Sequence, residues 1–177
     1  MQRRVAIIGN AGSGKTFLAQ KLAAARDAPV IDLDALFWKP PGQYKTKRPV
    51  EEVLAVLEEK RRGDAWIVEG VYGELVLPFL ERTQLLLWLD LPWEVCRARI
   101  EKRHIDRCGE DQRQELSSWL AELIEYAGAY WARDNLRSRA GHQRMLDTFA
   151  GSKVRLSSED EVTGFIAQEL LPRESAA

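Results

Sequence analysis

The sequence is poor in cysteine and histidine, and it has no long hydrophobic run. Its two cysteines, Cys96 and Cys108, lack the close spacing of zinc and redox motifs, so a disulfide framework or a zinc site has little support. No stretch approaches the ~20 consecutive apolar residues that a membrane-spanning helix needs, and the chain passes from Arg4 straight into a strand-like segment. We therefore expect a cytoplasmic protein with free thiols, no signal peptide and no membrane span.

An excess of positive charge is also absent. The 26 basic and 27 acidic residues give a net charge of -1, whereas a surface that holds duplex DNA usually has a clear cationic excess. The composition therefore disfavours nucleic acid as a partner. The arginines are nevertheless clustered, at Arg97, Arg99, Arg103, Arg107 and Arg113 and again at Arg133, Arg137, Arg139 and Arg144. This clustering indicates a local anion site.

The length and composition predict one folded domain over residues 1–177. A hydrophobic share of 45% and a charged share of 30% are typical of a globular protein. Short apolar runs at 5–8, 30–33, 65–68, 85–89 and 154–156 read as strands, and segments of helical periodicity at 15–26, 49–62, 91–100, 111–127 and 158–170 separate them. Strands that alternate with helices predict an α/β fold, a parallel sheet with helices on both faces.

The sequence GNAGSGKT at residues 9–16 satisfies the phosphate-binding pattern GxxxxGK[ST] in full. It directly follows an apolar strand and directly precedes a helix, which is the context that this motif requires. The predicted nucleotide-binding residues are Gly9, Asn10, Ala11, Gly12, Ser13, Gly14, Lys15 and Thr16. Lys15 is expected to reach the β- and γ-phosphates, and Thr16 to hold Mg²⁺. The motif thus predicts ATP and Mg²⁺ as the bound groups.

Three carboxylates follow two of the predicted strands. Asp32 and Asp34 end the second strand, and their i, i+2 spacing lets both project to one side of it. Asp34 is our candidate for the base on the acceptor side, and Asp32 for positioning Mg²⁺ waters; capping of the following turn is the alternative for either. Glu69 ends the third strand, where it could orient Mg²⁺ through water or be an ordinary strand-end acid.

Arginines at helical spacing predict a phosphate clamp. Arg99, Arg103 and Arg107 would share one face if their helix persists, and they lead into a polar segment that we predict to be a lid over about 104–114. A solvated basic face paired with Glu101 and Glu110 is the alternative. Arg133 and Arg137, again one turn apart, could meet the same phosphates. Neither histidine has a nucleophile or metal partner by spacing, so we assign no role to them.

Two adjacent aromatic residues lie close to Asp34 in the sequence. Phe37 and Trp38 precede a stiff segment that contains two prolines, so they could wall an acceptor pocket. Ordinary core packing is the alternative, and it explains the other tryptophans as well.

The order of these motifs resembles the adenylate-kinase-like group of P-loop NTPases, and within it the topology modulation (FlaR-type) proteins. The resemblance spans most of residues 3–170 and rests on GNAGSGKT, VIDLDALFW, WIVEGVY, LLLWLDLP and RARIEKR. It implies a three-layer α/β/α fold with a five-stranded parallel sheet, a nucleotide in the phosphate-binding loop and a small helical lid. It also implies phosphate and Mg²⁺ contacts for Lys15 and Thr16, an acceptor-side role for Asp34, and lid-proximal roles for Arg99 and Arg103.

The sequence departs from that group at the third strand. Glu69-Gly70 stands where relatives commonly have Asp-Gly, and no arginine follows closely enough to mirror the clamp for a nucleoside monophosphate. This departure disfavours a nucleoside monophosphate as the acceptor.

Three functions are compatible with these features. The leading hypothesis is an ATP-dependent phosphotransferase that acts on a small molecule or nucleotide not yet identified. A nucleotide-dependent regulator or ATPase associated with DNA topology or transcription is the first alternative, which the near-neutral charge disfavours. A nucleotide-binding protein with little turnover is the second.

Overall fold

The five predicted strands form one parallel sheet in a computed structural model that describes residues 2–38, 46–107 and 113–171. The strand order is β2-β3-β1-β4-β5, and every pairing is parallel. The strands are β1 (Arg4–Gly9), β2 (Val30–Asp32), β3 (Trp66–Gly70), β4 (Leu85–Leu89) and β5 (Ser152–Leu156). This arrangement confirms the predicted α/β class with five parallel strands.

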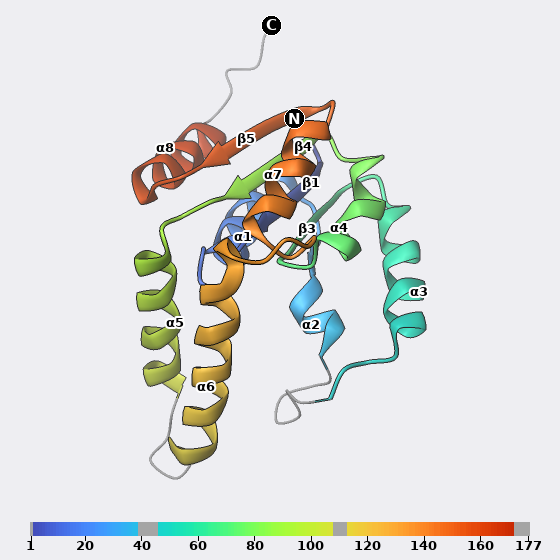
Figure 1. Cartoon of the computed structure of the whole chain (residues 1–177). Coiled ribbons are helices and arrows are strands. Elements are labelled where there is room, and N and C mark those ends of the chain that lie inside the picture. Colours follow the sequence, from blue (N-terminus) through green and yellow to red (C-terminus); the bar gives the residue numbers. More distant parts are fainter. Residues whose placement is uncertain (1, 39–45, 108–112, 172–177) are drawn as a thin grey trace, which may run out of the picture.

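Helices cover both faces of the sheet (Figure 1). Successive side chains of a strand point to opposite faces, so Val5 and Ile7 of β1 pack in one core and Ala6 and Ile8 in the other. The first core is closed by α1 (Lys15–Arg26) and α8 (Glu159–Leu170). The second is closed by α2 (Leu33–Phe37), α3 (Val50–Arg61), α4 (Gly73–Leu80) and α7 (Arg139–Thr148). Because the central strands are buried on both faces, they consist of continuous apolar runs.

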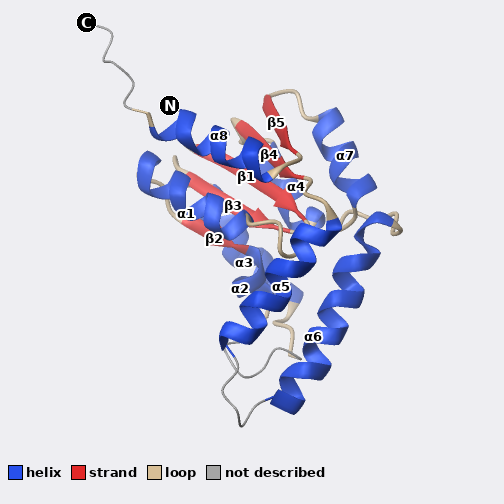
Figure 2. Cartoon of the chain, turned by 90° about the vertical axis from the view of Figure 1, so that its left-hand side faces the viewer, coloured by secondary structure: helices blue, strands red, loops and turns tan. Residues whose placement is uncertain are grey.

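Two further helices extend beyond the carboxyl edge of the sheet, where the strand arrows end (Figure 2). They are α5 (Trp93–Arg107) and α6 (Arg113–Gly128), which lie side by side in both views. Helix α5 continues past Ile100, where the polar sequence led us to expect its end. The predicted lid at 104–114 therefore includes the end of α5 and the start of α6. Its residues 108–112, and with them Cys108 and Glu110, lie outside the described residues.

Several short elements differ from the prediction. Strand β2 ends at Asp32 and helix α2 begins at Leu33, so Asp34 lies in a helix and the strand-spacing argument for it was wrong. Helices α4 and α7 and the 3₁₀ turn η2 (Ala129–Trp131) were not predicted. Helix α4 is almost wholly apolar and contains Pro78, which obscures a helical period, yet packing against the sheet stabilises it. None of the described helices is both long and apolar enough to cross a membrane.

Candidate active site

The loop between β1 and α1 has a backbone that only glycine adopts easily. Gly9, Gly12 and Gly14 have φ values of 153°, 76° and 96°. A Cβ atom at Gly9 would lie 2.5 Å from the carbonyl oxygen of Leu89, and one at Gly12 would lie 2.3 Å from that of Cys96. Strand β4 and helix α5 therefore press directly on the loop. The motif glycines serve close packing as well as backbone conformation.

Lys15 begins helix α1 and is buried inside the loop that precedes it. Only 6% of its surface is exposed, and its ammonium group donates a hydrogen bond of 2.9 Å to the carbonyl oxygen of Asn10. The loop therefore wraps a buried cation at the positive end of a helix dipole. Such a site favours phosphate, because N–H groups, dipole and cation attract the same anion.

Thr16 and Glu69 meet at the end of strand β3. The Thr16 hydroxyl donates to Oε1 of Glu69 at 2.6 Å, while Oε2 of Glu69 is buried and accepts no hydrogen bond from the described residues. Burial raises the pKa of Glu69, whereas the Lys15 charge and the Thr16 hydrogen bond lower it. An exposed hydroxyl beside a carboxylate oxygen is a donor set that suits Mg²⁺. These residues thus fit the predicted metal.

Among the described residues, protein side chains alone do not provide a complete set of metal ligands near Thr16 and Glu69. Within the part of the chain that the structure describes, no group of three or more His, Cys, Asp or Glu residues is placed to hold a metal ion. Mg²⁺ in nucleotide sites commonly has one or two protein ligands, with phosphate oxygens and waters completing its shell. Thr16 and Glu69 match that mode of binding.

Asp32 caps helix α2. Its Oδ1 accepts a hydrogen bond of 3.0 Å from the backbone N–H of Ala35, so the capping alternative holds for this oxygen. Asp32 is also the register partner of Glu69 on the neighbouring strand, and its negative charge raises the pKa of Glu69. Its carboxylate therefore lies close to the Thr16–Glu69 pair.

Asp34 lies in the first turn of helix α2, where the charges of both Lys15 and Arg103 act on it. Part of Asp34 is exposed, but the surrounding protein makes desolvation the largest influence on its pKa, which it raises. The charge of Lys15 lowers that pKa, Asp32 raises it, and a hydrogen bond from Tyr72 and the charge of Arg103 lower it. The fold thus brings together a carboxylate, the loop lysine and an arginine of α5.

Aromatic side chains pack beside Asp34. Tyr72 lies close enough to Asp34 to lower its pKa, and the Tyr72 hydroxyl accepts a hydrogen bond of 3.0 Å from Nε1 of Trp38. Its ring lies 4.6 Å from that of Phe37, which is buried in the core, while Trp38 is half-buried. Burial and the Asp34 charge raise the pKa of Tyr72, so the phenol keeps its proton and remains a donor. Core packing therefore explains Phe37, with Trp38 packed against the same core, whereas their role as the wall of an acceptor pocket stays a prediction.

The predicted arginine clamp is only partly assembled. Nη1 of Arg99 donates to the carbonyl oxygen of Ser13 at 3.0 Å, and Arg103 is exposed near Asp34. The side chain of Arg107 is outside the described part of the structure. Helix α5 therefore brings Arg99 to the P-loop and Arg103 to the neighbourhood of Asp34.

Arg133 and Arg137 are not placed as predicted. They lie in an irregular segment between η2 and α7, so they are not one helical turn apart. Arg133 donates to the carbonyl oxygens of Tyr126 and Arg137 at 2.5 and 3.1 Å, which fixes this segment instead of a phosphate. Arg137 donates to Glu74 at 2.5 Å, and its guanidinium lies 4.6 Å from the centre of the Tyr72 ring. It therefore lies against the aromatic residues beside Asp34.

The chain resembles known proteins in its three-dimensional structure but not detectably in its sequence. No family model and no curated protein sequence matches the chain. Among solved structures, a gluconokinase from Sinorhizobium meliloti 1021 superposes with a TM-score of 0.55, 14% identity, and coverage of 94% of this chain and 89% of the other. The chain shares the fold of a P-loop kinase.

Two further solved structures resemble the chain over nearly its whole length. Protein TT1252 from Thermus thermophilus has a TM-score of 0.50 and 18% identity, covering 94% of this chain and 97% of that one. A shikimate kinase from Bacteroides thetaiotaomicron has a TM-score of 0.49 and 16% identity, covering 95% and 96%. At 18% identity, the likeness to TT1252 concerns the fold alone.

Two buried polar residues, Asn10 and His142, make contacts that the sequence did not predict. Asn10 donates from its side chain to the carbonyl oxygen of Ala127 at 2.9 Å, which ties the loop to the end of α6. His142 is fully buried; its Nδ1 lies 2.7 Å from the Tyr130 hydroxyl and its Nε2 lies 3.2 Å from the carbonyl oxygen of Val71. Sequence spacing carries no signal for either contact, because the partners are far apart in the chain.

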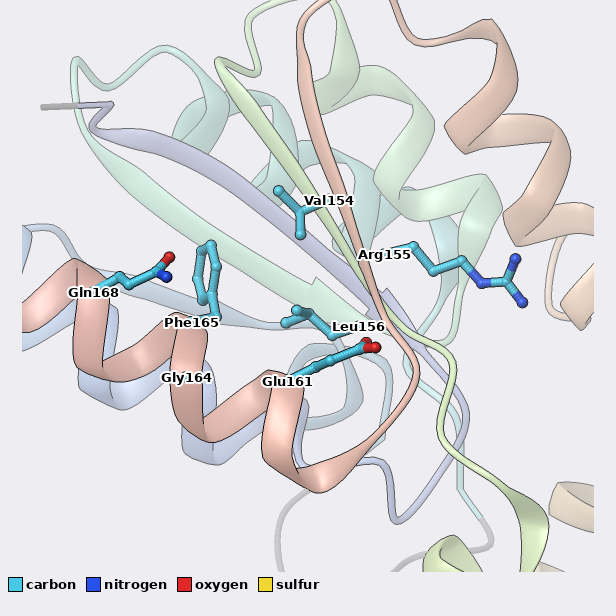
Figure 3. A pocket seen from close by; sticks show the side chains of 7 residues that line it. All are labelled: Val154, Arg155, Leu156, Glu161, Gly164, Phe165 and Gln168. Atoms are coloured by element: carbon cyan, nitrogen blue, oxygen red, sulfur yellow. The ribbon is translucent and has the colours of Figure 1, made fainter.

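A pocket of about 320 Å³ lies elsewhere, between strand β5 and helix α8 (Figure 3). Val154 and Leu156 face α8 across it, whereas Arg155 points to the opposite side of the strand. The lining residues are Val154, Arg155, Leu156, Glu161, Gly164, Phe165 and Gln168. They include neither the P-loop nor Asp34, so this pocket does not mark the P-loop site.

Proposed function

We propose that the protein is an ATP-dependent phosphotransferase that transfers the γ-phosphoryl group to a hydroxyl or phosphate group of a small molecule. One observation carries the proposal: Asp34 directly follows the carboxyl end of β2 and the P-loop directly follows that of β1, in one parallel sheet, and the charges of Lys15 and Arg103 both act on the pKa of Asp34. A carboxylate at this edge of the sheet would receive the proton of an acceptor hydroxyl. A protein that only bound nucleotide would not need this carboxylate.

The nucleotide phosphates would be held by the backbone N–H groups of residues 9–16 and by the N-terminus of α1. Lys15 would exchange its hydrogen bond with Asn10 for phosphate oxygens. Mg²⁺ would be held by the Thr16 hydroxyl, with Glu69 and Asp32 orienting its waters, and it would neutralise phosphate charge during transfer.

On the acceptor side, Asp34 would take up the proton that the attacking hydroxyl loses. The Tyr72 hydroxyl would donate to Asp34 and orient the carboxylate, while the charges of Lys15 and Arg103 favour its ionised form. The positive charges of Lys15, Arg99 and Arg103 would stabilise negative charge on the transferred group. Tyr72, Trp38 and nearby Arg137 favour a small polar acceptor.

Within the kinase fold, we place the chain beside the topology modulation (FlaR-type) group, on the motifs that carry that resemblance. A regulator associated with DNA is the alternative that this placement brings. The net charge of -1 does not support it. Binding of the protein to a duplex oligonucleotide, with and without ATP and at several salt concentrations, would favour the alternative if ATP changed the affinity.

The test is acceptor-stimulated release of ADP. Candidate acceptors are sugars, polyols, hydroxy acids and nucleoside monophosphates, each supplied with ATP and Mg²⁺. We expect one class to stimulate turnover, and Asp34→Asn to reduce kcat by about 100-fold or more while ATP still binds. Asp64→Asn, which changes an exposed acid in the turn after α3, is the matched control and should keep full activity. ATP binding without stimulation by any acceptor would contradict the proposal.

A further inference from the structure

Helix α5 is packed directly on the P-loop, and this contact determines where Arg99 lies. A Cβ atom at Gly12 would lie 2.3 Å from the carbonyl oxygen of Cys96 and 2.9 Å from Cγ1 of Ile100. One at Gly14 would lie 3.0 Å from Nη1 of Arg99. The guanidinium of Arg99 therefore lies against the backbone of the loop that would hold the nucleotide phosphates.

Two groups hold this guanidinium from different parts of the chain. Nη1 donates to the carbonyl oxygen of Ser13 in the loop, and Nη2 donates to Oε1 of Glu159 at 2.6 Å. Glu159 is in the first turn of α8, sixty residues further along the chain. Arg99 thus bridges α5, the P-loop and α8.

The contact with Glu159 is the one that limits the motion of Arg99. The side chains of Arg99 and Glu159 are 38% and 59% exposed, so packing alone does not restrict the arginine. A single bond to Ser13 would leave a long side chain free to swing, whereas two bonds in different directions define the plane of the guanidinium. A guanidinium that is already oriented before the reaction stabilises developing negative charge more effectively than one that must first be ordered.

Helix α8 itself does not depend on Glu159. Its N-cap is Ser158, whose hydroxyl accepts from the N–H of Glu161, and Glu161 also accepts from the backbone of Ser157. Asp160 and Glu161 remain in the first turn to favour the helix dipole if Glu159 loses its charge. A neutral residue at 159 should therefore leave the fold intact.

We propose that Glu159 is a positioning residue that holds Arg99 over the P-loop for contact with the terminal phosphate of the nucleotide. The inference rests on the proposed function, because it assigns Arg99 a role toward the phosphoryl group that is transferred. Glu159 itself acts only through Arg99.

The experiment compares Glu159→Gln with Asp160→Asn, which removes an acid from the same helical turn. For both variants we would measure the affinity for AMP-PNP, a nonhydrolysable ATP analogue, and the affinity for ADP, each in the presence of Mg²⁺. Thermal unfolding of both variants would be measured as well. We expect Glu159→Gln to weaken AMP-PNP binding about fivefold and to change ADP binding less than twofold. Asp160→Asn should change neither, and both variants should unfold within a few degrees of the wild type.

A double variant tests whether Glu159 acts through Arg99. Arg99→Lys removes the guanidinium that bonds to both partners, so adding Glu159→Gln to it should cost nothing further in AMP-PNP affinity. Equal weakening of AMP-PNP and ADP, no weakening at all, or additive effects in the double variant would each overturn the inference. These measurements need no acceptor, so failure to find an acceptor would reject the phosphotransferase while leaving the Glu159 result readable.

Discussion

The hydroxyl of Thr16 and the carboxylate of Glu69 form a 2.6 Å hydrogen bond between the first turn of α1 and the end of β3. Glu69 is 1% exposed, and its second oxygen has no hydrogen-bond partner among the described residues. Leaving a buried carboxylate half-satisfied costs free energy. The pair is therefore better explained as a site for a cation than as a device for stability.

Thr16→Val should separate these two roles. The substitution keeps the side-chain shape but removes the hydroxyl that donates to Oε1 of Glu69. Because that hydrogen bond lowers the pKa of Glu69, its loss should raise this pKa further. We expect nucleotide binding to need at least about tenfold more Mg²⁺, and the free energy of unfolding to change by about 1–3 kcal/mol at most. Nucleotide titrations at several Mg²⁺ concentrations and denaturant unfolding measure the two effects. Thr16→Ser keeps the hydroxyl and should resemble the wild type; equal Mg²⁺ requirements for both variants would contradict the assignment.

Gly12→Ala should disturb the contact between the P-loop and α5. Its φ of 76° is unfavourable for alanine, and the new Cβ would lie 2.3 Å from the carbonyl oxygen of Cys96, a backbone atom that cannot move alone. We expect a loss of about 2–4 kcal/mol in the free energy of unfolding, together with weaker nucleotide binding.

Gly164→Ala is the matched control for that substitution. It lies in helix α8, and a Cβ there meets no atom of the described chain within 4 Å. Alanine should stabilise this position by about 0.5–1 kcal/mol, because glycine is the poorer helix former. Denaturant unfolding of both variants tests the comparison, and similar effects at the two sites would show that α5 does not press on the loop.

His142 should make stability depend on pH. Burial lowers its pKa to about 3 from the ordinary 6.5. Below pH 6.5, His142 is therefore protonated in the unfolded chain but stays neutral in the folded protein. The free energy of unfolding consequently falls as the pH falls toward 3. One proton corresponds to about 1.4 kcal/mol per pH unit.

His142→Gln should remove that part of the pH dependence. The variant is expected to be less stable than the wild type at pH 7 by about 1–3 kcal/mol, because the bonds to Tyr130 and Val71 are disturbed, but to lose less stability between pH 6 and 4. Urea unfolding at a series of pH values measures the slope. A slope in His142→Gln that runs parallel to the wild-type slope would disprove the explanation.

Local sequence patterns predicted the sheet and the nucleotide loop, and they failed where the elements were short. The apolar runs of β1 and β4 and the glycine spacing of residues 9–16 are properties of consecutive residues. Helix α2 was missed because its five residues directly follow β2, and Asp34 was therefore assigned to the wrong element. The end of α5 was predicted at Ile100 because the polar segment from Asp106 to Asp111 resembles a turn, whereas the helix continues to Arg107.

The sequence by itself determined the P-loop, its lysine and threonine, and the alternation that produces a parallel sheet, because each depends on neighbours in the chain. Only the tertiary structure decided which charges meet. Thr16 reaches Glu69 because β1 and β3 pair in parallel, with Ile7 opposite Glu69. Arg99 reaches Glu159 because β4 and β5 pair in parallel, so that α5 and α8 both begin beyond the same end of the sheet. Arg137 lies against the Tyr72 ring although the two residues are far apart in the chain. Contacts over such separations depend on register and packing, which no local pattern records.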